Sequence, residues 1–152
     1  MNKVLCLVLF AGLWSNLYAQ GEGHVTKHSS HHSMSQGMDD ARIPLGLTPQ
    51  MKQHQLANMR AHLEAVQAIV GLMGAGDFDK ASEIAYARLG LTEEMRRMCS
   101  QFTEDYTAIG MAFHNSGDTL GNALQSEDMQ KSLEALNTTL GYCTQCHATF
   151  RH

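Results

Sequence analysis

The absence of proline from the last two thirds of the chain limits the folds open to it more than any other feature. The 152-residue sequence has two prolines, Pro44 and Pro49, and none after them. Proline interrupts helices and is common in turns, and β-branched runs are also scarce here. The second half is rich in Ala, Leu, Met, Glu and Gln, which form helices readily. We therefore expect one compact all-α domain, a size that suits the chain length.

The first predicted helix begins at Thr48-Pro49, with Thr48 as N-cap and Pro49 in the first helical position. Gly74-Ala75-Gly76 marks its end. Between them, apolar residues recur at spacings of three and four, which predicts one inward face. These residues are Leu56, Met59, Leu63, Val66, Val70 and Met73.

Three more helices are expected after this one. Asp77 is the predicted cap of a second helix, which ends at Gly90 and turns Phe78, Ala81, Ala85 and Leu89 inward. Thr92-Glu93-Glu94 fits the start of a short helix within a stretch that is otherwise hard to interpret. A third long helix is predicted from about Met111 to Leu124, weakened by Gly117 and Gly121. Ser126-Glu127-Asp128 starts the last one.

The last helix has a stripe that joins apolar residues to cysteine and histidine. Its members, spaced alternately by four and three, are Met129, Leu133, Leu136, Leu140, Cys143, His147 and Phe150. Helices with one apolar face and short connections predict an antiparallel four-helix bundle, a fold that builds cofactor sites between facing helices.

The motif Cys143-Thr144-Gln145-Cys146-His147 lies on this stripe. C-x-x-C-H is the attachment signature of c-type haem. Residues three and four apart share a helix face, so both thiols can reach the haem vinyl groups while His147 reaches the iron. We predict one covalent haem c, bound through Cys143 and Cys146, with His147 as the axial ligand.

Two other chemistries use the C-x-x-C pattern. A redox dithiol usually begins a helix that follows a strand, and no strand is expected before Cys143. A zinc site needs further ligands, and none occur at a convincing local spacing. Both alternatives are less compatible with the sequence than haem.

A sixth iron ligand, if there is one, must come from another helix, because only five residues follow His147. In an up-down-up-down bundle, the start of the first helix lies beside the end of the fourth. The groups expected to face the iron are therefore Lys52, Leu56, Met59 and His62. Methionine on such a face is also common core packing, so Met59 is either ligand or filler.

The first nineteen residues have the features of an export signal. Lys3 precedes a short apolar run from Val4 to Trp14, and we expect cleavage after Ala19. Of the 11 basic residues, Lys3 would leave with the signal, so ten remain against 15 acidic ones. This balance disfavours nucleic acid as a partner. Residues 20–47 are expected to form a loosely held His-rich linker, and residues 48–152 the bundle.

The linker contains its own candidate metal ligands. Imidazole suits Cu(II), Ni(II) and Zn(II), although a solvated linker is the simpler interpretation. The candidates are His24, His28, His31, His32, Met34, Met38, Asp39 and Asp40. Cys99 has no predicted partner once the haem uses Cys143 and Cys146. It is expected to be a buried small residue or, alternatively, to form an intermolecular disulfide.

The sequence resembles the cytochrome c′ family over residues 48–152. The resemblance rests on the C-terminal C-x-x-C-H, on Arg151 four residues after His147, on Gly-Asp-Phe-Asp at 76–79 and on the helix from Phe113 to Leu124. It implies a four-helix bundle in the bacterial periplasm, often a homodimer. It also implies an apolar residue above the iron at Leu56, or a methionine in low-spin members. Arg151 is expected near the haem, Lys52 stands where the family often has Arg, and residues 91–110 have no clear counterpart.

These features lead to two hypotheses about function. The first is a periplasmic monohaem c-type cytochrome, not an enzyme, which transfers electrons to a redox partner or binds a small gas such as NO or CO. No membrane segment is expected after signal cleavage. The alternative is a periplasmic copper or nickel binding protein that acts through the His-rich tail.

Overall fold

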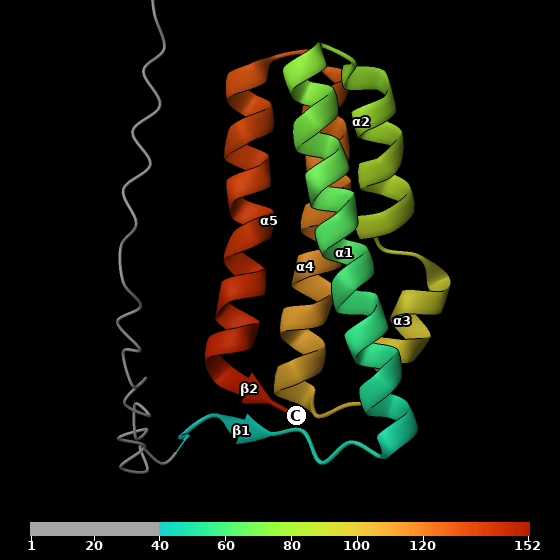
Figure 1. Cartoon of the computed structure of the whole chain (residues 1–152), viewed down its shortest axis with the longest axis vertical. Coiled ribbons are helices and arrows are strands. Elements are labelled where there is room, and N and C mark those ends of the chain that lie inside the picture. The colour runs from blue at the N-terminus through green and yellow to red at the C-terminus, as the bar shows by residue number, and fades with distance from the viewer. Residues whose placement is uncertain (1–39) are drawn as a thin grey trace, which may run out of the picture. The chain divides into compact units, whose positions relative to one another are not determined.

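The computed structural model describes residues 40–152, which are mostly helical (Figure 1). The prediction of an all-α helical bundle is confirmed. In the described part of the chain, no helix has the length and apolar character needed to cross a membrane. The elements in order are β1 (Ile43–Pro44), α1 (Pro49–Ala75), α2 (Phe78–Ile84), the π-helical turn η1 (Ala85–Leu89), α3 (Glu93–Cys99), α4 (Glu104–Gln125), α5 (Met129–Thr149) and β2 (Phe150–Arg151).

Most helix starts lie where the sequence places them. In four helices, the side-chain oxygen of the residue before the helix accepts a hydrogen bond from the backbone N–H three residues later, at 3.1–3.3 Å. α1 ends at Gly76, whose φ of 76° is the left-handed conformation that glycine adopts without strain. The four capping residues are Thr48, Asp77, Thr92 and Asp128.

The predicted start of the third long helix was wrong. α4 begins at Glu104, a full two turns before Met111. Thr103 precedes the helix, and Glu104 and Asp105 place two negative charges in its first turn, where the helix dipole favours them. Gly110 therefore lies inside α4.

Gly117 and Gly121 of α4 allow a close approach between helices, where the sequence suggested only weakness. A Cβ added at Gly117 would lie 2.4 Å from the Leu89 carbonyl oxygen. One added at Gly121 would lie 2.6 Å from the Tyr86 ring. Both glycines are buried, so α4 packs directly on η1 and on the end of α2.

The predicted apolar stripes were only partly right. On α1, Leu63 is 69% and Val70 51% exposed, while Ala65 and Ile69 are buried in the core. On α5, Leu133 is 51% exposed. The reason is that α5 packs mainly on α4 and α1 mainly on α2 and η1, so α1 and α5 do not cover each other.

The two strands join the segment before α1 to the end of α5. Ile43 pairs with Phe150, and Pro44 with Arg151, in a parallel two-stranded ladder. Phe150 is buried, and its ring contacts Tyr106 of α4 with centroids 5.3 Å apart. Residues 40–47, which the sequence assigned to the linker, therefore include an ordered contact with the C-terminus.

Candidate cofactor site

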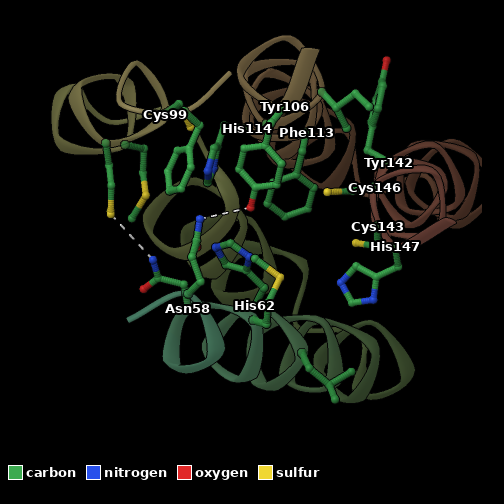
Figure 2. A pocket seen from close by; sticks show the side chains of 18 of the residues that line it. Asn58, His62, Cys99, Tyr106, Phe113, His114, Tyr142, Cys143, Cys146 and His147 are labelled. Carbon is green, nitrogen blue, oxygen red and sulfur yellow. Dashed lines mark hydrogen bonds between the residues drawn. The ribbon is translucent and has the colours of Figure 1, made fainter. Parts of the chain in front are cut away.

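A mostly apolar cavity of about 410 Å³ lies among α1, α3, α4 and α5 (Figure 2). Its volume is within the range of small-molecule and cofactor sites. Each of the four helices contributes one wall, and the residues predicted from the sequence lie on two of them. These are Leu56, Met59 and His62 on α1 and Cys143, Cys146 and His147 on α5.

The α5 wall carries the C-x-x-C-H motif. Cys143 and Cys146 are half-buried free thiols, and His147 is exposed in the last turn of the helix. Burial raises the pKa of both thiols, and for Cys146 the neighbouring Cys143 adds to the effect. Figure 2 shows all three side chains on the same helix, at one side of the cavity. The prediction that they share one face is therefore consistent with their placement.

Contacts between helices show which residues of α1 lie level with His147. Gln55 pairs with Tyr106, and His62 with Phe113, at the same offset along α1 and α4. Tyr106 meets Phe150, and the Ser116 carbonyl meets Thr139, which relates α4 to α5. Interpolation between these four contacts places His147 level with Asn58.

This register shows how far each of the four α1 residues expected to face the iron lies from the level of His147. Leu56 and Met59 lie on either side of the level of His147, and both border the cavity. His62 borders the cavity at the level of Cys143, about 6 Å further along the helix at 1.5 Å per residue. Lys52 is exposed and is not among the cavity residues.

The α4 wall supplies aromatic and imidazole groups that the sequence analysis missed. The buried Gln55 amide donates to the Tyr106 hydroxyl at 3.0 Å, and burial raises the pKa of Tyr106 to about 12. Phe113 lies 4.9 Å from the His62 ring, measured between centroids. The late predicted start of the helix explains why Tyr106 was missed.

Two imidazoles lie side by side at this wall. The His114 and His62 ring centroids are 5.5 Å apart, and His114 Nδ1 contacts the Leu89 carbonyl oxygen at 2.9 Å. Burial lowers the pKa of His62 to about 4, helped by His114 and Arg88. Burial also lowers the pKa of His114. Both side chains are therefore neutral at pH 7.

The α3 wall is rich in sulfur. Met95, Met98 and Cys99 border the cavity from α3, together with Phe102 in the loop that follows. Cys99 is buried, as expected for a small apolar residue, and burial raises the pKa of its thiol. Figure 2 shows Cys99 and His147 on opposite sides of the cavity.

The side chain of Arg42, just before β1, contacts the backbone of His147, the candidate axial ligand. Arg42 NH1 donates to the His147 carbonyl oxygen at 3.2 Å, and Arg42 NH2 lies 2.7 Å from Asp40 Oδ2. The Arg42 hydrogen bond lowers the pKa of Asp40 to about 2. Arg151 Nε donates to the Arg42 carbonyl at 3.2 Å and lies 3.8 Å from Asp40. Arg151 is exposed and is not among the cavity residues.

The predicted export signal and most of the His-rich tail lie outside the described residues. Of the tail's candidate ligands only Asp40 is described, and it pairs with Arg42 and Arg151. Within residues 40–152, no group of three or more His, Cys, Asp or Glu side chains is arranged to hold a metal ion.

The donor set at the cavity fits a covalently held haem. Two free thiols and one imidazole open from a single helix onto an apolar cavity. Comparisons of the chain with protein-family models, with curated proteins and with solved structures find no match.

Proposed function

We propose that the chain is an exported c-type cytochrome that holds one haem c in this cavity, within an antiparallel four-helix bundle of the cytochrome c′ kind. The observation that carries the proposal is that Cys143, Cys146 and His147 border the same apolar cavity from the end of α5. Cys143 and Cys146 would form the thioether bonds, and His147 would bind the iron.

Haem would supply an iron centre for one-electron transfer or for binding a diatomic gas. The protein's part is to hold it and to keep water away from it. Phe113 and Tyr106 on α4 and Leu56 on α1 form apolar walls around the site. Burial and the axial ligands are the main controls on the potential of such a centre.

Leu56 and Met59 determine which of the two roles is available. If Leu56 faces the iron, an open coordination position lies in a crowded apolar pocket, which admits NO or CO and excludes larger or anionic ligands. If Met59 binds the iron, both axial positions are filled by the protein. The centre then suits electron transfer, because neither ligand need leave.

The side of the cavity between α1 and α5 is the proposed contact region for partners. Leu63 and Leu140 border the cavity and are both exposed. Further along the same two helices, Val70 and Leu133 are exposed apolar residues. A redox partner or a second copy of the chain would cover these exposed apolar residues.

The His-rich tail supports an alternative proposal, the handling of copper or nickel ions in the periplasm. Deleting residues 20–40 and titrating Cu(II) tests it. Loss of the bound metal supports the alternative, whereas unchanged binding removes it.

The main proposal is tested by absorption spectra of protein exported together with haem-attachment machinery. Spectra are recorded oxidised, reduced and reduced under CO. A high-spin spectrum that shifts with CO supports gas binding beneath Leu56. A low-spin spectrum that is indifferent to CO, with the weak far-red methionine–iron band, supports Met59 as ligand. Protein without a haem spectrum would refute the proposal.

A further inference from the structure

The last turn of α5, which carries His147, is held by the segment that precedes α1. Residues 40–45, which we call the strap, lie beside the end of α5, where the two short strands pair. The Leu45 amide also donates to the Arg151 carbonyl oxygen at 2.9 Å. Figure 1 shows β1 and β2 next to each other at the lower end of the helices. The strap therefore joins the start of the described chain to the turn with the candidate axial ligand.

Arg42 is the strap residue that reaches His147. The Nε atom and one terminal nitrogen of its guanidinium donate to the two carboxylate oxygens of Asp40, at 2.9 and 2.7 Å. This two-point contact fixes the plane of the guanidinium. The remaining terminal nitrogen donates to the His147 carbonyl oxygen at 3.2 Å. Arg151 Nε donates to the Arg42 carbonyl oxygen, also at 3.2 Å, so the backbone of the strap is fixed as well.

The carbonyl that Arg42 contacts is one that the helix itself leaves without a partner. The last four carbonyls of an α-helix have no N–H within the helix to accept from, and α5 ends at Thr149. The Phe150 N–H donates to the Cys146 carbonyl oxygen, and the next carbonyl, that of His147, accepts from Arg42. The helix dipole also favours a cation at this end.

The other contacts of the strap hold residues beyond α5. The strand pair and the Leu45 hydrogen bond involve Phe150 and Arg151. Among the hydrogen bonds of residues 40–152, only that from Arg42 joins a side chain to the His147 backbone. Loss of the Arg42 side chain would therefore release the turn with His147, while the strand pair still ties the strap to the end of the chain.

Helix ends fray, and a fraying last turn would let an imidazole there take several orientations. His147 is exposed, so packing around its side chain does little to fix it. We propose that Arg42 is a positioning residue, which holds the last turn of α5 and thereby sets the orientation of the His147 imidazole on the iron. This inference rests on the proposed haem. Groups that orient a metal ligand without touching the metal commonly control the properties of the site.

Amide exchange of the full-length exported chain, followed by mass spectrometry, tests the hold of Arg42 on α5 whether or not haem is attached. In Arg42→Gln we expect exchange in the peptide that covers residues 144–152 to be about threefold faster or more, the scale of one modest hydrogen bond. Arg42→Lys keeps the charge and a donor, so exchange should stay slow. Arg97→Gln, which removes an exposed arginine of α3, should have no effect. Unchanged exchange in Arg42→Gln overturns the proposal.

The ferric EPR spectrum of the haem-loaded protein tests the effect on the ligand, because it depends on the orientation of the axial imidazole in both spin states. Arg42→Gln should broaden or shift this spectrum, whereas Arg42→Lys and Arg97→Gln should leave it in place. Faster exchange with an unaltered EPR spectrum would mean that Arg42 stabilises the helix end without positioning His147, and would overturn the proposal. Protein without haem would refute the proposed function and this inference with it, whereas either contrary result in haem-loaded protein refutes the inference alone.

Discussion

At the scale of single residues, His62 links the cavity to the pH dependence of stability. Its pKa is lowered to about 4 by burial, so the native state keeps it neutral, while the unfolded chain protonates it below about pH 6.5. The contribution of neutral His62 to the free energy of unfolding is therefore complete above pH 6.5. It falls between pH 6.5 and about 4, by up to about 1.4 kcal/mol per pH unit. Urea unfolding at pH 7 and pH 5 measures the slope.

The buried neighbour His114, whose pKa is also lowered, adds to this loss of stability at low pH. His62→Leu should make the slope shallower, whereas a change at the exposed His152 should leave it unaltered. An unchanged slope in His62→Leu would mean that His62 is not buried in its neutral form.

Tyr106 is the other residue whose role can be measured directly. Its hydroxyl accepts the bond from the buried Gln55 amide, so Tyr106→Phe leaves a buried donor without its partner. We expect a loss of about 1–3 kcal/mol in the free energy of unfolding. Tyr86→Phe is the matched control, because its bond to Asn122 is exposed and should contribute less than about 1 kcal/mol. Equal effects in the two variants would argue against the buried pair.

At the scale of elements, the close packing of α4 on η1 gives a clear prediction. Gly117→Ala places a Cβ against the backbone of Leu89 and Gly90, neither of which can move as a side chain would. We expect a destabilisation of about 1–3 kcal/mol, despite the better helix propensity of alanine. Gly71→Ala, on an open face of α1, should instead stabilise by up to about 1 kcal/mol. Chemical denaturation compares them, and a neutral Gly117→Ala would contradict the packing.

The sequence predicted helix starts well and helix faces less well, for different physical reasons. Caps such as Thr48 and Asp128 act locally, so the signal lies within a few residues. The inward face of α1 depends on which helices it meets. Its later turns use Ala65 and Ile69 against the core, and its earlier turns use Leu56 and Met59 at the cavity. The spacing of apolar residues alone does not show that one part of α1 packs in the core while another part borders the cavity.

The cavity walls, too, could be predicted from the sequence only where a local motif specifies them. The α5 wall was predictable because C-x-x-C-H is a local motif with known chemistry. Tyr106, Met98 and His114 reach the cavity only through the packing of α3 and α4, which no local pattern specifies. Thr103 at the N-cap position and the acidic first turn at Glu104 and Asp105 were the local signals for the true start of α4.

At the scale of the whole molecule, the proposed haem would stabilise the chain, because a group that binds only the folded form adds its binding free energy to the stability of that form. We expect the thermal midpoint to be clearly lower for protein exported without haem-attachment machinery than for protein exported with it. Identical midpoints would mean that nothing fills the cavity.

The central claim is that haem is joined covalently to α5, and mass spectrometry of the exported chain tests it most directly. The account predicts that the peptide with Cys143, Cys146 and His147 gains the mass of one haem, and that a variant with Cys143→Ala and Cys146→Ala gains none. It also predicts that Cys99, on the opposite side of the cavity, stays unmodified. An unmodified peptide from cells that attach haem to another c-type cytochrome would contradict the account.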